Sequence, residues 1–83
     1  METYVLLARS ITYGQRMQHL LQRNGIRAKV YRAPRDINES GCGYGVEVAA
    51  EGFYCALSLL QQGGLSPSRV YRKQYNRYYE VNV

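Results

Sequence analysis

The 83-residue chain has few of the residues that build covalent or metal-held frameworks, with only two cysteines and one histidine. Two cysteines do not make the disulfide framework of a small secreted domain, so we expect free thiols in a reducing, cytoplasmic setting. His19 has no cysteine or acidic residue at ligand spacing, and the sequence indicates no metal and no cofactor. No apolar run approaches the roughly 20 residues of a membrane span. The acidic Glu2 and the short apolar stretch 4–8 predict no signal peptide.

Acidic residues are also scarce, with 6 Asp and Glu against 11 Lys and Arg, which gives a net charge of +5. Nine tyrosines accompany this positive charge. Basic side chains neutralise phosphate and aromatic faces stack on bases, so a nucleic-acid partner fits the composition. An anionic small molecule or an acidic protein fits it equally well.

The apolar pattern predicts one α+β domain. Strands are expected over residues 4–8, 27–31, 45–48 and 69–73. A helix after the first strand begins at a capping box formed by Thr12, with Ser10 as the alternative cap, and ends at Gly25. A second helix follows the third strand and ends at Gly63.

The resulting β-α-β-β-α-β order predicts a ferredoxin-like sandwich, a four-stranded antiparallel sheet with both helices on one face. Residues 1–73 form this single domain, and residues 74–83 form a tyrosine-rich C-terminal extension. That extension either lengthens the fourth strand, adds an edge strand or reaches a neighbouring subunit. The residues expected between the sheet and the helices are Val5, Leu7, Val30, Val46, Val48, Phe53, Leu57 and Leu60.

The loop over residues 34–45 is longer than a hairpin requires and contains a cysteine between two glycines. Gly41 and Gly43 leave the Cys42 thiol exposed and allow backbone N–H groups to converge on an anion. Together with Arg35 just upstream, they would lower the pKa of the Cys42 thiol and make it reactive. The alternative interpretation is a small residue in a glycine-rich turn without chemistry.

The same loop carries a family resemblance. Gly25-Ile26, a basic strand, Ala-Pro-Arg-Asp, Asn-Glu-Ser and then Cys42-Gly43 resemble the small bacterial sulfur/selenium carrier protein-like family. The resemblance covers about residues 4–71, although Gly41 separates Ser40 from Cys42 where the family runs serine directly into Cys-Gly.

The resemblance implies a carrier rather than a turnover enzyme, with sulfur- or selenium-donating and accepting enzymes as partners. It implies that Cys42 accepts the sulfur or selenium atom as a persulfide or its selenium analogue. The Gly43 and Tyr44 amides and an arginine such as Arg35 would then hold the negative charge.

Two alternatives to the carrier stay open at this stage. In a nucleic-acid-binding module, Tyr4 would stack a base on the open sheet face, but the outward Glu47 disfavours this. In an oligomeric interaction module, the sheet face or the C-terminal extension would pair with a second copy, which is also compatible with a carrier. The remaining cysteine, Cys55, is expected to be partly buried beside Leu59, with a resolving thiol as the alternative.

Overall fold

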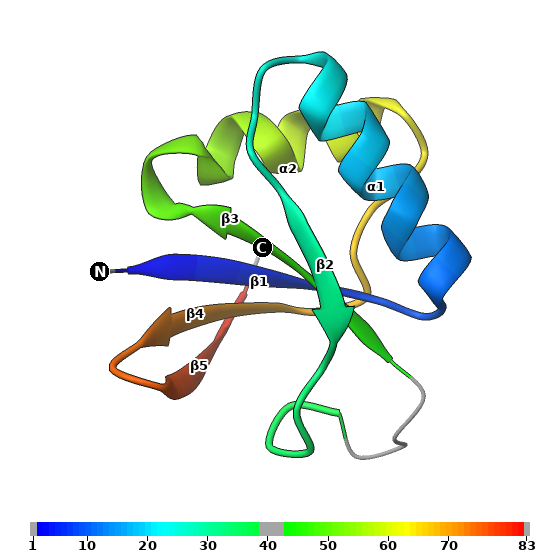
Figure 1. Cartoon of the computed structure of the whole chain (residues 1–83). Coiled ribbons are helices and arrows are strands. Elements are labelled where there is room, and N and C mark those ends of the chain that lie inside the picture. The colour runs from blue at the N-terminus through cyan, green and yellow to red at the C-terminus, as the bar shows by residue number, and fades with distance from the viewer. Residues whose placement is uncertain (1, 39–42, 83) are drawn as a thin grey trace.

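The computed structural model describes residues 2–38 and 43–82 and has an α+β architecture. Five antiparallel strands form one sheet in the order β2-β3-β1-β4-β5, and two helices pack on one of its faces (Figure 1). Within the described residues, neither helix has the length and hydropathy that a membrane span needs. The elements are β1 (Thr3–Ala8), α1 (Ile11–Arg23), β2 (Lys29–Arg32), β3 (Tyr44–Ala49), a 3₁₀ turn (Ala50–Gly52), α2 (Phe53–Gln62), β4 (Val70–Gln74) and β5 (Arg77–Val81).

Helix α1 begins and ends on local signals in the sequence. The Ser10 hydroxyl accepts a hydrogen bond from the Tyr13 backbone N–H at 3.1 Å, so Ser10 is the N-cap and the expectation of Thr12 is wrong. At the other end Gly25 adopts a φ of +78°, a left-handed conformation that glycine reaches without steric cost. The predicted end of the helix is therefore confirmed.

The main core lies between the sheet and the two helices. Val46 and Val48 of β3 point into it, as their alternation predicted, and meet Phe53 and Leu60 of α2. Tyr4 also points to this side, where its ring stacks on Phe53 with centroids 3.9 Å apart. The place on the open sheet face that the nucleic-acid alternative gave it is therefore wrong.

A second apolar cluster covers part of the open face of the sheet. It contains Val5, Leu7, Ala33, Ile37 and Tyr71, so the placement of Val5 and Leu7 between the layers is wrong. In β1 the side chains that point toward the helices are instead those of the alternate positions Leu6 and Ala8. This first strand is buried on both faces.

The sheet has one strand more than the four expected. β5 pairs antiparallel with β4, with Gln74 opposite Arg77, which makes residues 75–76 a two-residue hairpin turn. Tyr75 and Asn76 have φ values of 52° and 63°, as a turn with two left-handed residues requires. Of the three roles considered for the C-terminal residues, the structure shows the edge strand.

Candidate functional site

The antiparallel order brings four strand ends to one edge of the sheet. Ala8, the last residue of β1, lies opposite Tyr44, the first residue of β3, and Tyr44 also lies opposite Arg32 at the end of β2. The Leu7 N–H donates to the Arg69 carbonyl at 2.8 Å, which extends the contact of β1 with the chain just before β4. The segment between β2 and β3 therefore leaves the sheet beside the end of β1 and the start of β4 (Figure 1).

The first half of that segment is fixed to the open face of the sheet. The Ile37 N–H donates to the Pro34 carbonyl at 3.1 Å and the Asn38 N–H to the Arg35 carbonyl at 3.3 Å, which forms two successive turns. These turns direct the Ile37 side chain into the second apolar cluster, where it is 6% exposed. Burial of this one side chain anchors the described first half of the segment, which ends at Asn38.

Asn38 and Gly43 tie together the two ends of the stretch 39–42. The Asn38 Nδ2 donates to the Gly43 carbonyl oxygen at 3.2 Å, and the Ala33 N–H donates to the same oxygen at 3.3 Å. A Cβ at Gly43 would come 3.0 Å from the Asn38 Oδ1, so the absence of a side chain permits this close approach. The two ends of the cysteine-containing stretch thus have a defined separation.

A pocket of about 380 Å³ adjoins these two ends. Arg9, Arg69 and Asp36 line it together with Asn38 and Gly43. The described residues that line it are Leu7, Ala8, Arg9, Asp36, Ile37, Asn38, Gly43, Ser68, Arg69 and Tyr71. The pocket therefore combines an apolar floor from the open sheet face with charges of both signs.

The guanidinium group of Arg9 lies over an aromatic side chain of α1. Its guanidinium carbon lies 5.3 Å from the centroid of the Tyr13 ring. The Tyr13 hydroxyl in turn donates to the Ser66 carbonyl at 3.1 Å, which joins α1 to the chain that leads into Arg69. A guanidinium over an aromatic face is attracted by the ring quadrupole, so this stack limits the positions that Arg9 adopts.

The predicted site residues divide into described and undescribed ones. Cys42 and Gly41 lie outside the described residues. Gly43 lines the pocket, Tyr44 begins β3, and Arg35 is exposed at the first turn, outside the described lining.

Sequence reasoning missed Arg9 and Arg69, the two basic residues that do line the pocket. They lie 60 positions apart, and only the pairing of β1 with β4 brings them to the same edge. The sequence did contain one indication of their proximity: Arg9 directly follows the first expected strand, and Arg69 begins the last expected strand.

The second cysteine does not belong to the core. Cys55 is a free, exposed thiol on α2, so the expectation of a partly buried residue beside Leu59 is wrong. Across residues 2–38 and 43–82, no three His, Cys, Asp or Glu side chains gather as a metal site.

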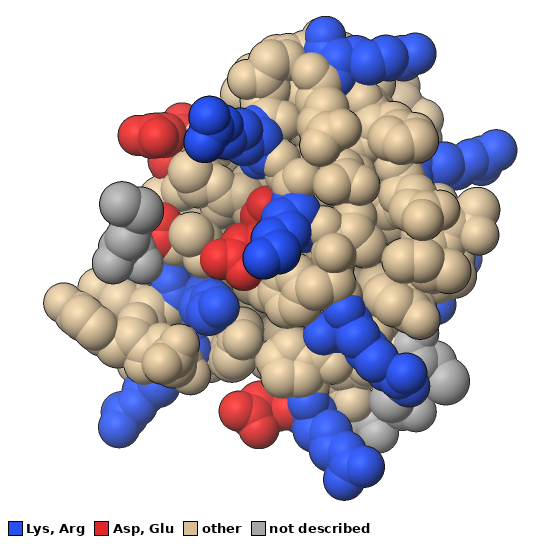
Figure 2. Space-filling model, viewed as in Figure 1, with Lys and Arg blue, Asp and Glu red and all other residues tan. Residues whose placement is uncertain are grey.

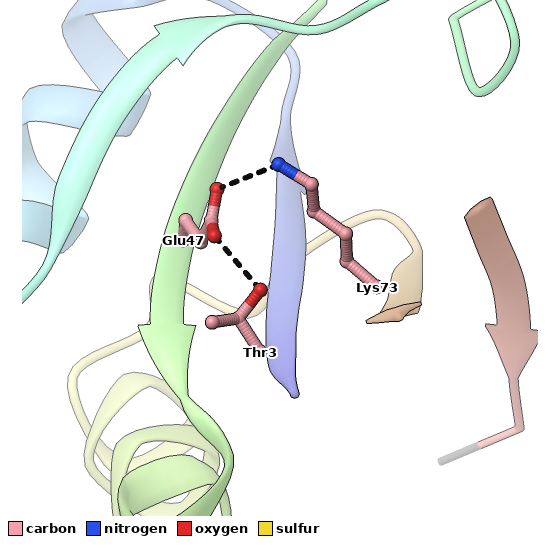
Figure 3. Close-up of polar contacts among 3 residues, drawn as sticks. All are labelled: Thr3, Glu47 and Lys73. Carbon is pink, nitrogen blue, oxygen red and sulfur yellow. Dashed lines mark hydrogen bonds and ion pairs between the residues drawn. The ribbon is translucent and has the colours of Figure 1, made fainter. Parts of the chain in front are cut away.

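A polar cluster occupies the open sheet face away from the pocket. The Glu47 carboxylate accepts a hydrogen bond from the Thr3 hydroxyl at 2.8 Å and pairs with the Lys73 ammonium at 3.7 Å (Figure 3). Burial and then the adjacent Glu47 carboxylate raise the pKa of the Tyr31 hydroxyl well above its ordinary value. This oxygen is buried and has no hydrogen-bond partner among the described residues.

This cluster bears on the nucleic-acid alternative. Glu47 stands at the middle of the open face, where a base-stacking module needs an aromatic side chain, and it neutralises Lys73. The Lys and Arg side chains visible in Figure 2 are spread over the surface with acidic groups among them, rather than gathered in one patch. On the face shown in Figure 2, the basic side chains therefore form no continuous track along which a nucleic-acid backbone could bind.

Another hollow lies at the opposite end of the strands. It measures about 770 Å³, and its lining includes Gly25, Ala49 and Lys29. Thr3, the first residue of β1, also lines it, whereas the smaller pocket begins at Leu7 near the end of that strand. The length of β1 therefore separates the larger hollow from the ends of the cysteine-containing stretch.

Comparison with known proteins identified a family. The model of the family described as "Putative Se/S carrier protein-like" matches residues 3–72. No curated protein and no solved structure matches the chain. The matched stretch runs from the start of β1 into β4, so it includes the segment between β2 and β3 and both arginines of the pocket.

Proposed function

The chain belongs to the Se/S carrier protein-like family, and from that premise we propose that it carries sulfur or selenium on Cys42 for delivery to a partner enzyme. Cys42 is the accepting thiolate. Arg35 and the glycines that flank Cys42 stabilise the negative charge of the loaded form, with the Tyr44 amide beside them. The family match supports the cargo, and the chemistry of a thiol between two glycines supports the residue.

The transfer needs no external oxidant if the cargo arrives as a sulfane atom on a thiol, R–S–SH or R–S–SeH. The Cys42 thiolate attacks the terminal atom, and a bond forms between its Sγ and that atom. The bond from this atom to the donor sulfur breaks, and its electron pair leaves with the donor as R–S⁻. Delivery to an acceptor thiolate is the same exchange in reverse.

The observation that carries the proposal is the position of the pocket. Asn38 is the last described residue before residues 39–42, and Gly43 is the first described residue after them. Both line the pocket together with Arg9 and Arg69. Guanidinium groups near a cysteine favour its thiolate and an anionic persulfide, because both carry negative charge. The pocket at the two ends of the stretch 39–42 therefore suits an anionic sulfur species.

Intact-protein mass spectrometry tests the proposal on the full chain. We expect incubation with a low-molecular-weight persulfide, or with its selenium analogue, to add the mass of one sulfur or selenium atom. Cys42→Ser should remove this adduct. Cys55→Ser is the matched control, because Cys55 is an exposed thiol on α2 that does not line this pocket, and it should keep the adduct. An unmodified wild type, or an adduct that survives Cys42→Ser, would contradict the proposal.

A further inference from the structure

The pocket beside Asn38 and Gly43 has a distinctive combination of charges. Among the described residues, two arginines, Arg9 and Arg69, and one acidic residue, Asp36, line the same space. Leu7 and Ile37, which belong to the apolar cluster on the open sheet face, also line it. A ligand that fits this lining has a negative group, a positive group and an apolar part.

The size of the pocket excludes a bare sulfur or selenium species as its full complement. A water molecule takes about 30 Å³ of liquid, and a hydrosulfide ion is only slightly larger. The pocket measures about 380 Å³, within the range of sites for small organic ligands, which begins at about 300 Å³. The space therefore suits the molecule that brings the sulfur atom rather than the atom alone.

We propose that this pocket binds a free α-amino acid whose side-chain thiol carries the sulfane sulfur or selenium, and that this zwitterion is the small-molecule donor. The assignment of a donor rests on the proposed carrier function, whereas the binding itself does not. Arg9 and Arg69 hold the α-carboxylate, and Asp36 holds the α-ammonium group. The thiol arm lies along the apolar floor formed by Leu7 and Ile37.

The mixed charge favours a zwitterion over a simple anion. Asp36 repels a ligand that carries negative charge only, whereas an α-ammonium group converts that repulsion into attraction. The guanidinium groups offer a carboxylate charge-assisted hydrogen bonds, which are stronger than neutral ones. In the transfer step the Cys42 thiolate takes the terminal atom, and the amino acid leaves as its thiolate with the electron pair of the broken bond.

The binding test uses S-methylcysteine, a stable thioether that keeps both charges but has no atom to transfer. It is titrated into full-length Cys42→Ser and followed by backbone amide shifts in NMR spectra. We expect shifts at Gly43, Ile37 and Arg69. Two comparison probes separate the charges, since the methyl ester lacks the carboxylate and 3-(methylthio)propionate lacks the ammonium group. Each should bind about three- to tenfold more weakly than S-methylcysteine.

Substitutions in the lining assign the two charges. Arg9→Gln, Arg69→Gln and Asp36→Asn should each weaken S-methylcysteine about three- to tenfold. The Asp36→Asn variant should bind 3-(methylthio)propionate with unchanged or higher affinity, because the repulsion by the carboxylate is gone. Arg69→Lys should restore part of the affinity, which a merely structural role of Arg69 would not explain. Arg16→Gln on the exposed side of α1 is the matched control and should have no effect.

The outcomes separate this inference from the carrier function. If S-methylcysteine causes no shifts at the pocket, or if the three lining variants bind it as Arg16→Gln does, the pocket assignment is wrong. Cys42 could then still take a sulfane atom from a protein donor in the mass assay. If the binding pattern holds but Cys42 acquires no atom from any persulfide, the carrier function fails and the pocket stands as an amino-acid site.

Discussion

The hydrogen bond between the Asn38 side chain and the Gly43 carbonyl allows a direct test of what stabilises the segment between β2 and β3. Asn38 is 7% exposed, and its Nδ2 lies 3.2 Å from the Gly43 carbonyl oxygen. Asn38→Ala removes this donor but does not orphan the carbonyl, since the Ala33 N–H still donates to it. We therefore expect the loss of about one buried hydrogen bond with its packing, about 1–2 kcal/mol of unfolding free energy.

Asn24 provides a matched control within the same chain. Its Nδ2 also donates to a backbone carbonyl, that of Leu20, at 2.8 Å, but the residue is exposed at the end of α1. Water replaces an exposed hydrogen bond when it is removed, so Asn24→Ala should cost about 0.5 kcal/mol or less. Urea unfolding of both variants measures the difference. An equal loss of unfolding free energy in the two variants, or a negligible loss in Asn38→Ala, would show that burial does not strengthen the hydrogen bond to Gly43.

A second substitution at the same position adds a pH dependence. Asn38→Asp keeps the shape but directs an oxygen, rather than an N–H, at the Gly43 carbonyl. The carboxylate is unfavourable there, and its protonated form donates again, so its pKa should be higher in the folded state than in the unfolded state. The variant should therefore lose stability as the pH rises from 4 to 7 relative to wild type. A constant difference across that range would refute the reasoning.

Three further predictions concern the core and the open face, and urea unfolding measures each. Tyr4→Leu and Phe53→Leu should show a coupling of about 0.5–1.5 kcal/mol in a double-mutant cycle, because their rings stack at 3.9 Å. Additive costs would contradict that stack. Gly45→Ala should cost about 1–3 kcal/mol, since its Cβ would come 2.8 Å from the Val5 Cγ1, and a neutral effect would show that Val5 moves freely. Tyr31→Phe should cost little at pH 7 and should lessen the loss of stability above about pH 10, because the folded state resists deprotonation of this hydroxyl while the unfolded state does not. An unchanged alkaline profile would contradict the burial of that oxygen.

The sequence predicted best those elements in which one face is apolar and the other polar. In β3 the apolar Val46 and Val48 flank the charged Glu47, and the structure places the two valines in the core and the glutamate on the open face. In α2 the helical spacing of Phe53 and Leu60 identified the buried side. A period of 2.0 or 3.6 residues decides the orientation in such segments.

The same reasoning could not orient β1. Val5, Leu6, Leu7 and Ala8 are all buried, so no polar position marks either face. The second apolar cluster was the missing information, and it depends on Ile37 folding back onto the sheet from a polar stretch. The orientation of the β1 side chains therefore depends on contacts with residues far away in the sequence, which a local pattern does not contain.

The edge strand and the pocket were missed for related reasons. The turn at residues 75–76 has a bulky tyrosine at a positive φ, where a sequence signal for a hairpin would be a glycine or an asparagine. The arginines of the pocket flank strands that pair only in the folded sheet, so nothing local relates them. Local patterns predicted the helices and the first four strands, whereas the pocket follows from which strands are neighbours.

The packing of β5 determines what proteolytic cleavage near the C-terminal end would expose. Val81 packs against the main core and Tyr78 against the apolar cluster on the open face, so β5 covers apolar surface on both sides of the sheet. Cleavage in the exposed turn at Tyr75 would remove both side chains and leave the backbone groups along one side of β4 unpaired. Such an uncovered strand is a template for pairing with another chain, so we expect proteolytic loss of β5 to promote aggregation.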